Sequence, residues 1–282
     1  MCVSLQDAEF TGTLLYIGEN IHPQHGEIRV LGYQNTPKNK SKGGNAMLLH
    51  FPAGKLMNPD NILDASKARS ILKDMKDAVS PQMATRGMSS GSRMKKGIVH
   101  VFDHDIYTIV LAKHASDIPQ ALSRVPVDRR PELNREIFEY YTQRFPGYQY
   151  ALCCFNNKEA QQAAPMFWWY TPKNNNFLEL PGIDAHDGSP PKEGAMVHVN
   201  SWVFMSSHRL RDNAINARRV SYTFLPDNLK DFLPKNIVGK RFSGAMKNGD
   251  YLMPLDTGPS IDLDAGRIVR SIISNGLNQN LV

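Results

Sequence analysis

Two β-prone stretches, Thr13-Leu-Leu-Tyr-Ile-Gly18 and Glu27-Ile-Arg-Val-Leu-Gly-Tyr33, decide the fold class of this chain. The first stretch is apolar, and the second partly alternates between polar and apolar residues. His22-Pro23-Gln24-His25-Gly26 lies between them and is typical of a turn. The sequence therefore predicts a β-hairpin close to the amino terminus.

Outward from this hairpin, strands and helices are both expected. Strand-like runs cover residues 45–51, 98–112 (two strands around Asp103-His104-Asp105), 148–155, 165–170, 177–180, 195–206, 219–224, 236–242 and 252–255. Apolar residues at helical spacing predict helices over 64–79, 117–125 and 131–145, with a short terminal helix over 268–273. Several helices between runs of strands predict an α+β fold, with helices packed on mainly antiparallel sheets.

The chain is expected to form a single α+β domain over residues 1–282, because no change in composition divides it. Residues 80–97 are rich in Ser, Gly, Met and basic residues, which predicts a flexible loop or flap; a linker is the alternative. Residues 258–282 form a weakly patterned tail. Lys173-Asn-Asn-Asn176 joins two strand-like runs and favours a second hairpin.

Composition narrows the class of protein. The chain is 41% hydrophobic and 21% charged, which is ordinary for a globular domain. It has no apolar run long enough to span a bilayer and no secretory signal pattern, so we expect a cytoplasmic protein without a membrane partner. The net charge of +6 falls in short basic clusters that favour solvated loops over nucleic-acid binding. The sequence leaves open whether the chain forms a homo-oligomer.

The three cysteines do not indicate a disulfide framework, because their number is odd and two of them are adjacent. No Cys and His residues have zinc-ligand spacing, and the sequence predicts neither a cofactor nor a metal. Cys153 and Cys154 lie in an apolar run and are interpreted as inert, buried thiols facing opposite sides of a strand.

Cys2 differs from the other two cysteines because it directly follows the initiator methionine. Removal of Met1 would leave a cysteine with a free α-amine, so that one residue would carry both a nucleophile and a base. This arrangement is typical of N-terminal-nucleophile hydrolases. The alternative is a small hydrophobic residue at the start of the first strand.

The opening of the chain resembles the cysteine N-terminal-nucleophile hydrolases, and most closely their penicillin V acylase and bile-salt hydrolase group. The resemblance covers about the first twenty-two residues: Met1-Cys2-Val3-Ser4-Leu5, a polar turn, and Leu14-Leu-Tyr-Ile-Gly-Glu-Asn20. Met-Cys-Thr and, after a hairpin, Gly-Arg-Asn-Met-Asp are typical of the group. Gly18 and Asn20 match, whereas Glu19 replaces the Arg and His22 replaces the Asp.

This resemblance implies a four-layer αββα sandwich and hydrolysis of a non-peptide amide of a small molecule through a thioester on Cys2. It also implies that Asn side chains support the oxyanion, for which Asn20 and Asn45 are candidates. His22, in place of the missing Asp, is a candidate to assist the thiol.

A loop signature, Asp184-Ala-His186-Asp187-Gly188, follows the aromatic strands. His186 with Asp184 or Asp187 is suited to act as an oriented general base that contacts substrate. A turn whose carboxylates cap backbone N–H groups is the equal alternative.

Two further patterns are candidates for binding. Trp168 and Tyr170 share one face of an aromatic strand and suit a nucleobase or a sugar, although core packing is the commoner explanation. His100, His104 and their neighbouring aspartates have the residue types of a metal site, but a turn between strands is favoured.

The sequence thus supports two classes of function. The first is a cysteine amidohydrolase that acts through Cys2 on a C–N bond. The alternative is a non-enzymatic protein that binds a ligand or another protein, in which Cys2 has no chemical role.

Overall fold

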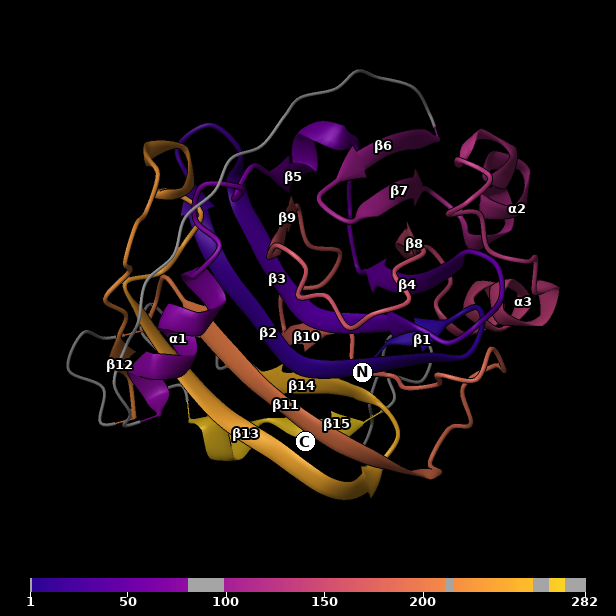
Figure 1. Cartoon of the computed structure of the whole chain (residues 1–282). Helices are drawn as coiled ribbons and strands as arrows, with labels where there is room; N and C mark the ends of the chain where they lie inside the picture. The colour runs from indigo at the N-terminus through magenta and orange to yellow at the C-terminus, as the bar shows by residue number, and fades with distance from the viewer. Residues whose placement is uncertain (1, 81–98, 211–215, 256–263, 272–282) are drawn as a thin grey trace.

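The strands form three sheets in the computed structural model, which describes residues 2–80, 99–210, 216–255 and 264–271 (Figure 1). The largest sheet has the order β12 (Arg218–Arg219), β13 (Asn236–Lys247), β11 (Met196–Ser207), β2 (Ala8–His22), β3 (Gly26–Asn39), β9 (Met166–Tyr170) and β5 (Ile62–Leu63). All neighbours in it are antiparallel except β11 and β2, which run parallel.

Two smaller sheets complete the architecture, and both are antiparallel. The five-stranded sheet has the order β1 (Val3–Ser4), β4 (Asn45–Phe51), β8 (Gln149–Phe155), β7 (Tyr107–Ala112) and β6 (His100–His104). The three-stranded sheet consists of β10 (Phe177–Leu180), β14 (Asp250–Pro254) and β15 (Val269–Ser271).

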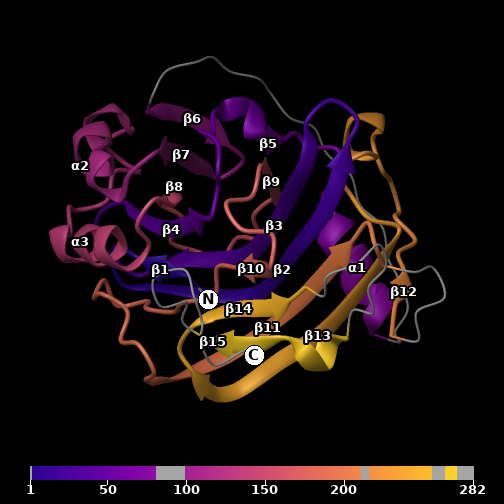
Figure 2. The same cartoon turned by 180° about the vertical axis from the view of Figure 1, so that it is seen from behind.

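The helices are short and lie on the outer faces of the two larger sheets (Figures 1 and 2). On the seven-stranded sheet, α1 (Ile71–Val79) buries Leu72 and Met75. On the five-stranded sheet lie α2 (Ile118–Ala121) and α3 (Arg135–Arg144). Single 3₁₀ turns occur at η1 (Pro59–Asn61), η2 (Ala115–Asp117), η3 (Leu122–Arg124), η4 (Asp227–Leu229) and η5 (Ala265–Arg267).

The main core lies between the sheets, and alternation along the strands separates it from two outer clusters. On β4, Met47 and Leu49 enter the central cluster, whereas Leu48 packs under the helices. This order of layers confirms the predicted α+β class. Cys153 and Cys154 lie in the central and the outer cluster respectively, both fully buried, as the sequence predicted.

The predicted amino-terminal hairpin is confirmed as β2 and β3, which are longer than expected because pairing continues to Asn39. The second predicted hairpin is wrong. β9 pairs with β3 and β5, whereas β10 pairs with β14, so the segment 171–176 carries the chain from one sheet to another. Lys173-Asn-Asn-Asn176 therefore marks a connection between layers and not a tight turn.

Other boundaries also differ from the expectation. The helix predicted over 64–79 begins only at Ile71, because Asp64 accepts the Ser66 N–H in a separate turn. Residues 269–271 pair with β14 as a strand, where a terminal helix was expected. Of the flap predicted over 80–97, residues 81–97 lie outside the described residues, as do 258–263 and 272–282 of the predicted tail. Within the described ranges, no helix is long and apolar enough to cross a bilayer.

Candidate functional site around Cys2

The amino-terminal strand runs beside the loop that contains Asp184 and His186. Ser4 N–H donates to the Ala185 carbonyl at 2.9 Å, and Ala185 N–H donates to the Cys2 carbonyl at 3.1 Å. Farther along, Ala8 N–H donates to the His186 carbonyl at 3.0 Å. These backbone bonds hold Cys2 against residues 184–187, although more than 180 positions separate them in the sequence.

Three functional groups meet at Cys2. Its backbone nitrogen donates to Asp184 Oδ1 at 3.4 Å, and the same oxygen lies 2.7 Å from His186 Nε2. The His186 ring is in turn hydrogen-bonded to the Cys2 side chain. A thiol, an imidazole and a carboxylate are therefore linked in that order, which is the arrangement of nucleophile, base and orienting group in cysteine-dependent acyl transfer.

The charges at this site depend on the pairing of His186 with Asp184. Burial alone would lower the pKa of His186, but hydrogen bonds to Asp184 and to the Cys2 side chain raise it to about 9. Burial opposes ionisation of Asp184. The positive charge of the amino terminus and the hydrogen bond from His186 nevertheless hold the pKa of Asp184 well below the usual range. At neutral pH the structure therefore favours an imidazolium–carboxylate pair.

Tyr33 adds a hydroxyl group to the surroundings of the thiol. It is hydrogen-bonded to the Cys2 side chain, and its own oxygen accepts from Asn35 Nδ2 at 3.1 Å. Asn35 Oδ1 accepts from the Tyr107 hydroxyl at 2.9 Å. Burial, followed by the charge of Cys2, raises the pKa of Tyr33 far above its ordinary value, so this hydroxyl stays a donor.

The loop 184–188 is held in place from two sides. Asn248 accepts from Asp184 N–H at 2.9 Å and donates to the Asp184 carbonyl at 2.8 Å. Gly188 has a φ of +79°, and a Cβ at this position would lie 2.8 Å from the Leu5 carbonyl oxygen. The carboxylate of Asp187 accepts from Ser189 N–H at 2.9 Å and caps a turn, whereas the carboxylate of Asp184 pairs with His186.

The structure does not bring Asn20 and His22 to Cys2. Both lie at the far end of β2, roughly 40 Å along the strand from Ala8 at 3.3 Å per residue. Asn20 Nδ2 donates to the Asp231 carbonyl, and the His22 ring packs against the Phe232 ring, with 4.3 Å between the ring centroids. Neither side chain therefore takes the assisting role that the family resemblance implied for it at the thiol.

Asn45, Trp168 and Tyr170 contact groups other than the Cys2 thiol. Asn45 ties down the amino-terminal segment by accepting from Gln6 N–H and donating to the Asp7 carbonyl. Trp168 is fully buried in the central core. Tyr170 is buried as well, but it lines a cavity of about 530 Å³ that is described below.

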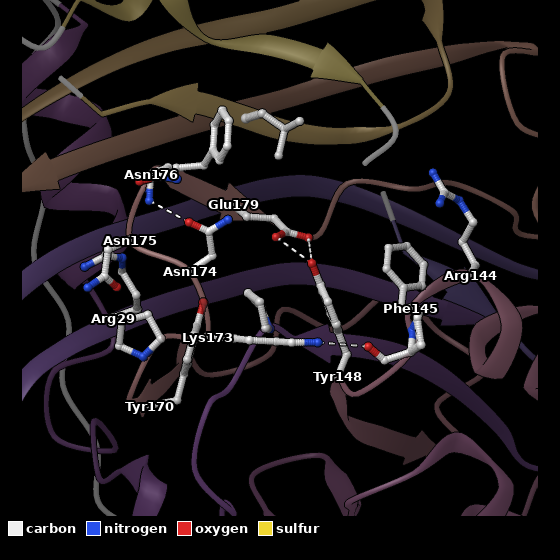
Figure 3. A pocket seen from close by; sticks show the side chains of 15 residues that line it. Arg29, Arg144, Phe145, Tyr148, Tyr170, Lys173, Asn174, Asn175, Asn176 and Glu179 are labelled. Atoms are coloured by element: carbon white, nitrogen blue, oxygen red, sulfur yellow. Dashed lines mark hydrogen bonds between the residues drawn. The ribbon is translucent and has the colours of Figure 1, made fainter. Parts of the chain in front are cut away.

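Two cavities of the described residues lie away from Cys2. The larger contains Arg29, Tyr148, Tyr170, Lys173 and Glu179 in its walls (Figure 3). The smaller, of about 340 Å³, lies near Asn20 and residues 230–236. Cys2 lines neither of them and is only 4% exposed.

Of the residues considered as a metal site, His100, Asp103 and His104 lie on β6, and Asp105 lies in the turn that leads to β7. Asp105 has a φ of +52° and pairs with Arg69, and Asp103 accepts from the Thr108 hydroxyl at 2.6 Å. In the described part of the chain, ligand atoms at metal-binding spacing come instead from His50, Glu179 and Asp250. The sequence analysis missed these three residues, because they lie on separate strands and form no motif.

Comparisons with known proteins leave the family of this chain open. No family model matches the sequence, and no curated protein matches it. Among solved structures, the chain is similar to baculovirus P35, with 12% identity, a TM-score of 0.42 and coverage of 90% of this chain and 91% of P35. It is also similar to a mutated baculovirus P35 after caspase cleavage, with 10% identity, a TM-score of 0.37 and coverage of 86% and 90%. Similarity at this level establishes neither a common family nor a common function.

Proposed function

We propose that the chain is a cysteine amidohydrolase in which Cys2 cleaves a non-peptide C–N amide bond through a thioester. The observation that carries this proposal is the linked set of Cys2, His186 and Asp184, held together by backbone bonds from β1. Asp184 contacts both the nitrogen of Cys2 and the imidazole, so one carboxylate orients both groups.

In the proposed reaction, the Cys2 sulfur attacks the amide carbonyl and its proton is held by His186. A protonated imidazole stabilises the attacking thiolate. Collapse of the tetrahedral intermediate breaks the C–N bond, and the imidazolium donates a proton to the leaving amine. Water then attacks the thioester, assisted by the neutral imidazole, and the acid and the thiol are released.

Removal of Met1 would give the site a second base. The backbone nitrogen of Cys2 would become an α-amine beside Asp184 Oδ1, which it contacts at 3.4 Å. An α-amine has an ordinary pKa of roughly 8 and can exchange protons at neutral pH. The Tyr33 hydroxyl, rather than Asn20 or Asn45, is the donor placed to support the oxyanion, because it already contacts the thiol.

Access to the thiol requires a local opening, since Cys2 is 4% exposed. β1 comprises only two residues and lies at the edge of its sheet, paired with β4 alone among named strands. Short edge elements open at a lower free energy than the whole domain. Substrate binding is therefore expected to displace β1 from the loop 184–187.

The test is amine release from penicillin V and from a glycine-conjugated bile salt, combined with intact mass. The proposal expects loss of Met1, amine release and a thioester adduct on Cys2. Cys2→Ser should abolish the adduct, whereas Cys153→Ala should retain it. Retention of Met1 would remove the α-amine from the mechanism. Absence of both amine release and adduct, in a folded protein, would overturn the proposal.

A non-enzymatic binding protein is the second candidate, and the enclosure of the Cys2 thiol favours it. In that case Cys2 is a buried residue of the first strand, and the cavity near Lys173 and Glu179 is the binding site. Cys2→Ala would then leave ligand binding unchanged and would cost only folding stability. The same variant abolishes function if the hydrolase proposal is correct.

A further inference from the structure

Three buried side chains converge at a place where the sheets meet. His50 on β4 is 1% exposed, Glu179 on β10 is 8% exposed, and Asp250 on β14 is fully buried. One ligand atom from each lies within 4.8 Å of the other two. His50 Nε2 and Asp250 Oδ2 are already 3.1 Å apart.

The remaining bonds of these side chains leave donor atoms directed at a common point. Asp250 Oδ1 accepts from Gly182 N–H at 2.7 Å and from Ile183 N–H at 3.1 Å, which fixes the carboxylate and leaves Oδ2 for the cluster. The Tyr148 hydroxyl is shared between the two oxygens of Glu179, at 3.0 and 2.9 Å. A carboxylate oxygen can accept a hydrogen bond and also bind an ion.

The cluster contains more acidic than basic groups. Glu179 and Asp250 place two buried carboxylates close together beside His50. The nearby cation Arg144 forms an ion pair with Glu193 at 2.5 Å, so part of its positive charge is already balanced by another carboxylate. One divalent cation would balance the charge of both carboxylates.

The cluster also has a route to solvent. Glu179 and Tyr148 belong to the wall of the 530 Å³ cavity, where Figure 3 shows the Tyr148 hydroxyl directed at the carboxylate. An ion bound to Glu179 would therefore keep a coordination position on the side of the cavity. Three protein ligands and one open position are typical of catalytic metal centres.

We propose that His50, Glu179 and Asp250 form a site for a divalent transition-metal ion, with Zn²⁺ or Mn²⁺ as the fitting ions. Ligands about 2.1 Å from a tetrahedral ion lie about 3.4 Å apart. The pair at 3.1 Å is close to this value, and separations up to 4.8 Å close by small side-chain rotations. An imidazole nitrogen among the ligands favours these ions over Ca²⁺ or Mg²⁺.

The experiment is titration of the EDTA-stripped, full-length protein with Zn²⁺ against a chromophoric chelator, repeated with Mn²⁺ by electron paramagnetic resonance. The site predicts one tightly bound ion per chain. Glu179→Gln, Asp250→Asn and His50→Gln should each weaken binding by at least about 10-fold, because each removes one ligand. Circular dichroism identifies any variant that fails to fold, and the other two then carry the test.

Cys2→Ser is the matched control, because the thiol, His186 and Asp184 also contain metal-binding groups. This variant should bind the ion as the unmodified chain does. The proposal is overturned if no saturable binding occurs, if the three cluster variants bind normally, or if Cys2→Ser removes the ion. None of these outcomes depends on hydrolase activity.

Discussion

Asp184 Oδ1 accepts a hydrogen bond from the backbone nitrogen of Cys2 at 3.4 Å, across 182 positions of sequence. The same oxygen pairs with His186, so one carboxylate joins the amino-terminal strand to an imidazole. A bridge between Val3 and Ala185 holds the two segments in register. The thiol environment is therefore a tertiary feature, assembled by the edge strand β1 and the loop 184–187.

Replacement of His186 should change how stability depends on pH. The pKa of this residue is raised to about 9, so the imidazolium–carboxylate pair stabilises the fold fully below pH 6.5 and loses that contribution as pH rises through 9. The contribution is at most about 3 kcal/mol. Urea unfolding of the unmodified chain should show this decline, and His186→Asn should flatten it. An equal decline in the variant would show that another group is responsible.

Gly188→Ala should lower the free energy of unfolding more than Gly194→Ala does. Gly188 and Gly194 both have positive φ, +79° and +70°, but only at Gly188 would a Cβ meet backbone, 2.8 Å from the Leu5 carbonyl oxygen. Gly194→Ala should cost about 1 kcal/mol from φ alone. Gly188→Ala should cost about 2 kcal/mol or more, measured by denaturant unfolding. Equal costs would show that the contact with Leu5 is not tight.

Glu19→Gln should be strongly destabilising. Glu19 is buried and pairs with Arg29 at 3.1 Å and Arg209 at 2.8 Å, so its neutralisation leaves the buried Arg29 with one partner, Glu27. The expected loss is about 3 kcal/mol of unfolding free energy. Glu9→Gln is the control, because the Glu9–Lys40 pair is exposed and should contribute under about 1 kcal/mol. Similar losses in both variants would contradict this account.

Cys153 and Cys154 should stay unmodified in the native protein. Burial raises the pKa of both thiols far above the ordinary value, and both are fully enclosed. Both thiols should therefore react with iodoacetamide only at the rate at which the whole protein unfolds. Peptide mapping after partial labelling reports each site separately. Labelling of either thiol faster than unfolding would show an opening of β8 that the packed core does not suggest.

The sequence predicted those features that depend on local pattern. Alternation and turn residues identified β2 and β3, and burial of Cys153 and Cys154 on opposite faces followed from their adjacency on a strand. Within the loop 184–188, the sequence singled out Asp184 and His186 as neighbours, and their side chains are 2.7 Å apart. In each case the signal lies within a few consecutive residues.

Features that depend on pairing between distant segments could not be predicted. Nothing in the sequence places Cys2 beside His186, or His50 beside Asp250. The family resemblance drew attention to Asn20 and His22, but β2 is long enough to carry them away from the thiol. Strand pairing, not sequence spacing, decides which polar groups meet.

The central claim is that His186 and Asp184 make Cys2 a reactive thiol, and the alkylation rate of Cys2 tests it most directly. Native protein is treated with iodoacetamide, and labelling of Cys2 is followed by mass spectrometry in the unmodified chain, His186→Asn and Asp184→Asn. The account predicts labelling of Cys2 well before global unfolding, slowed at least about 10-fold in both variants. Labelling of Cys2 only on unfolding, together with Cys153, or at an unchanged rate in both variants, would contradict it.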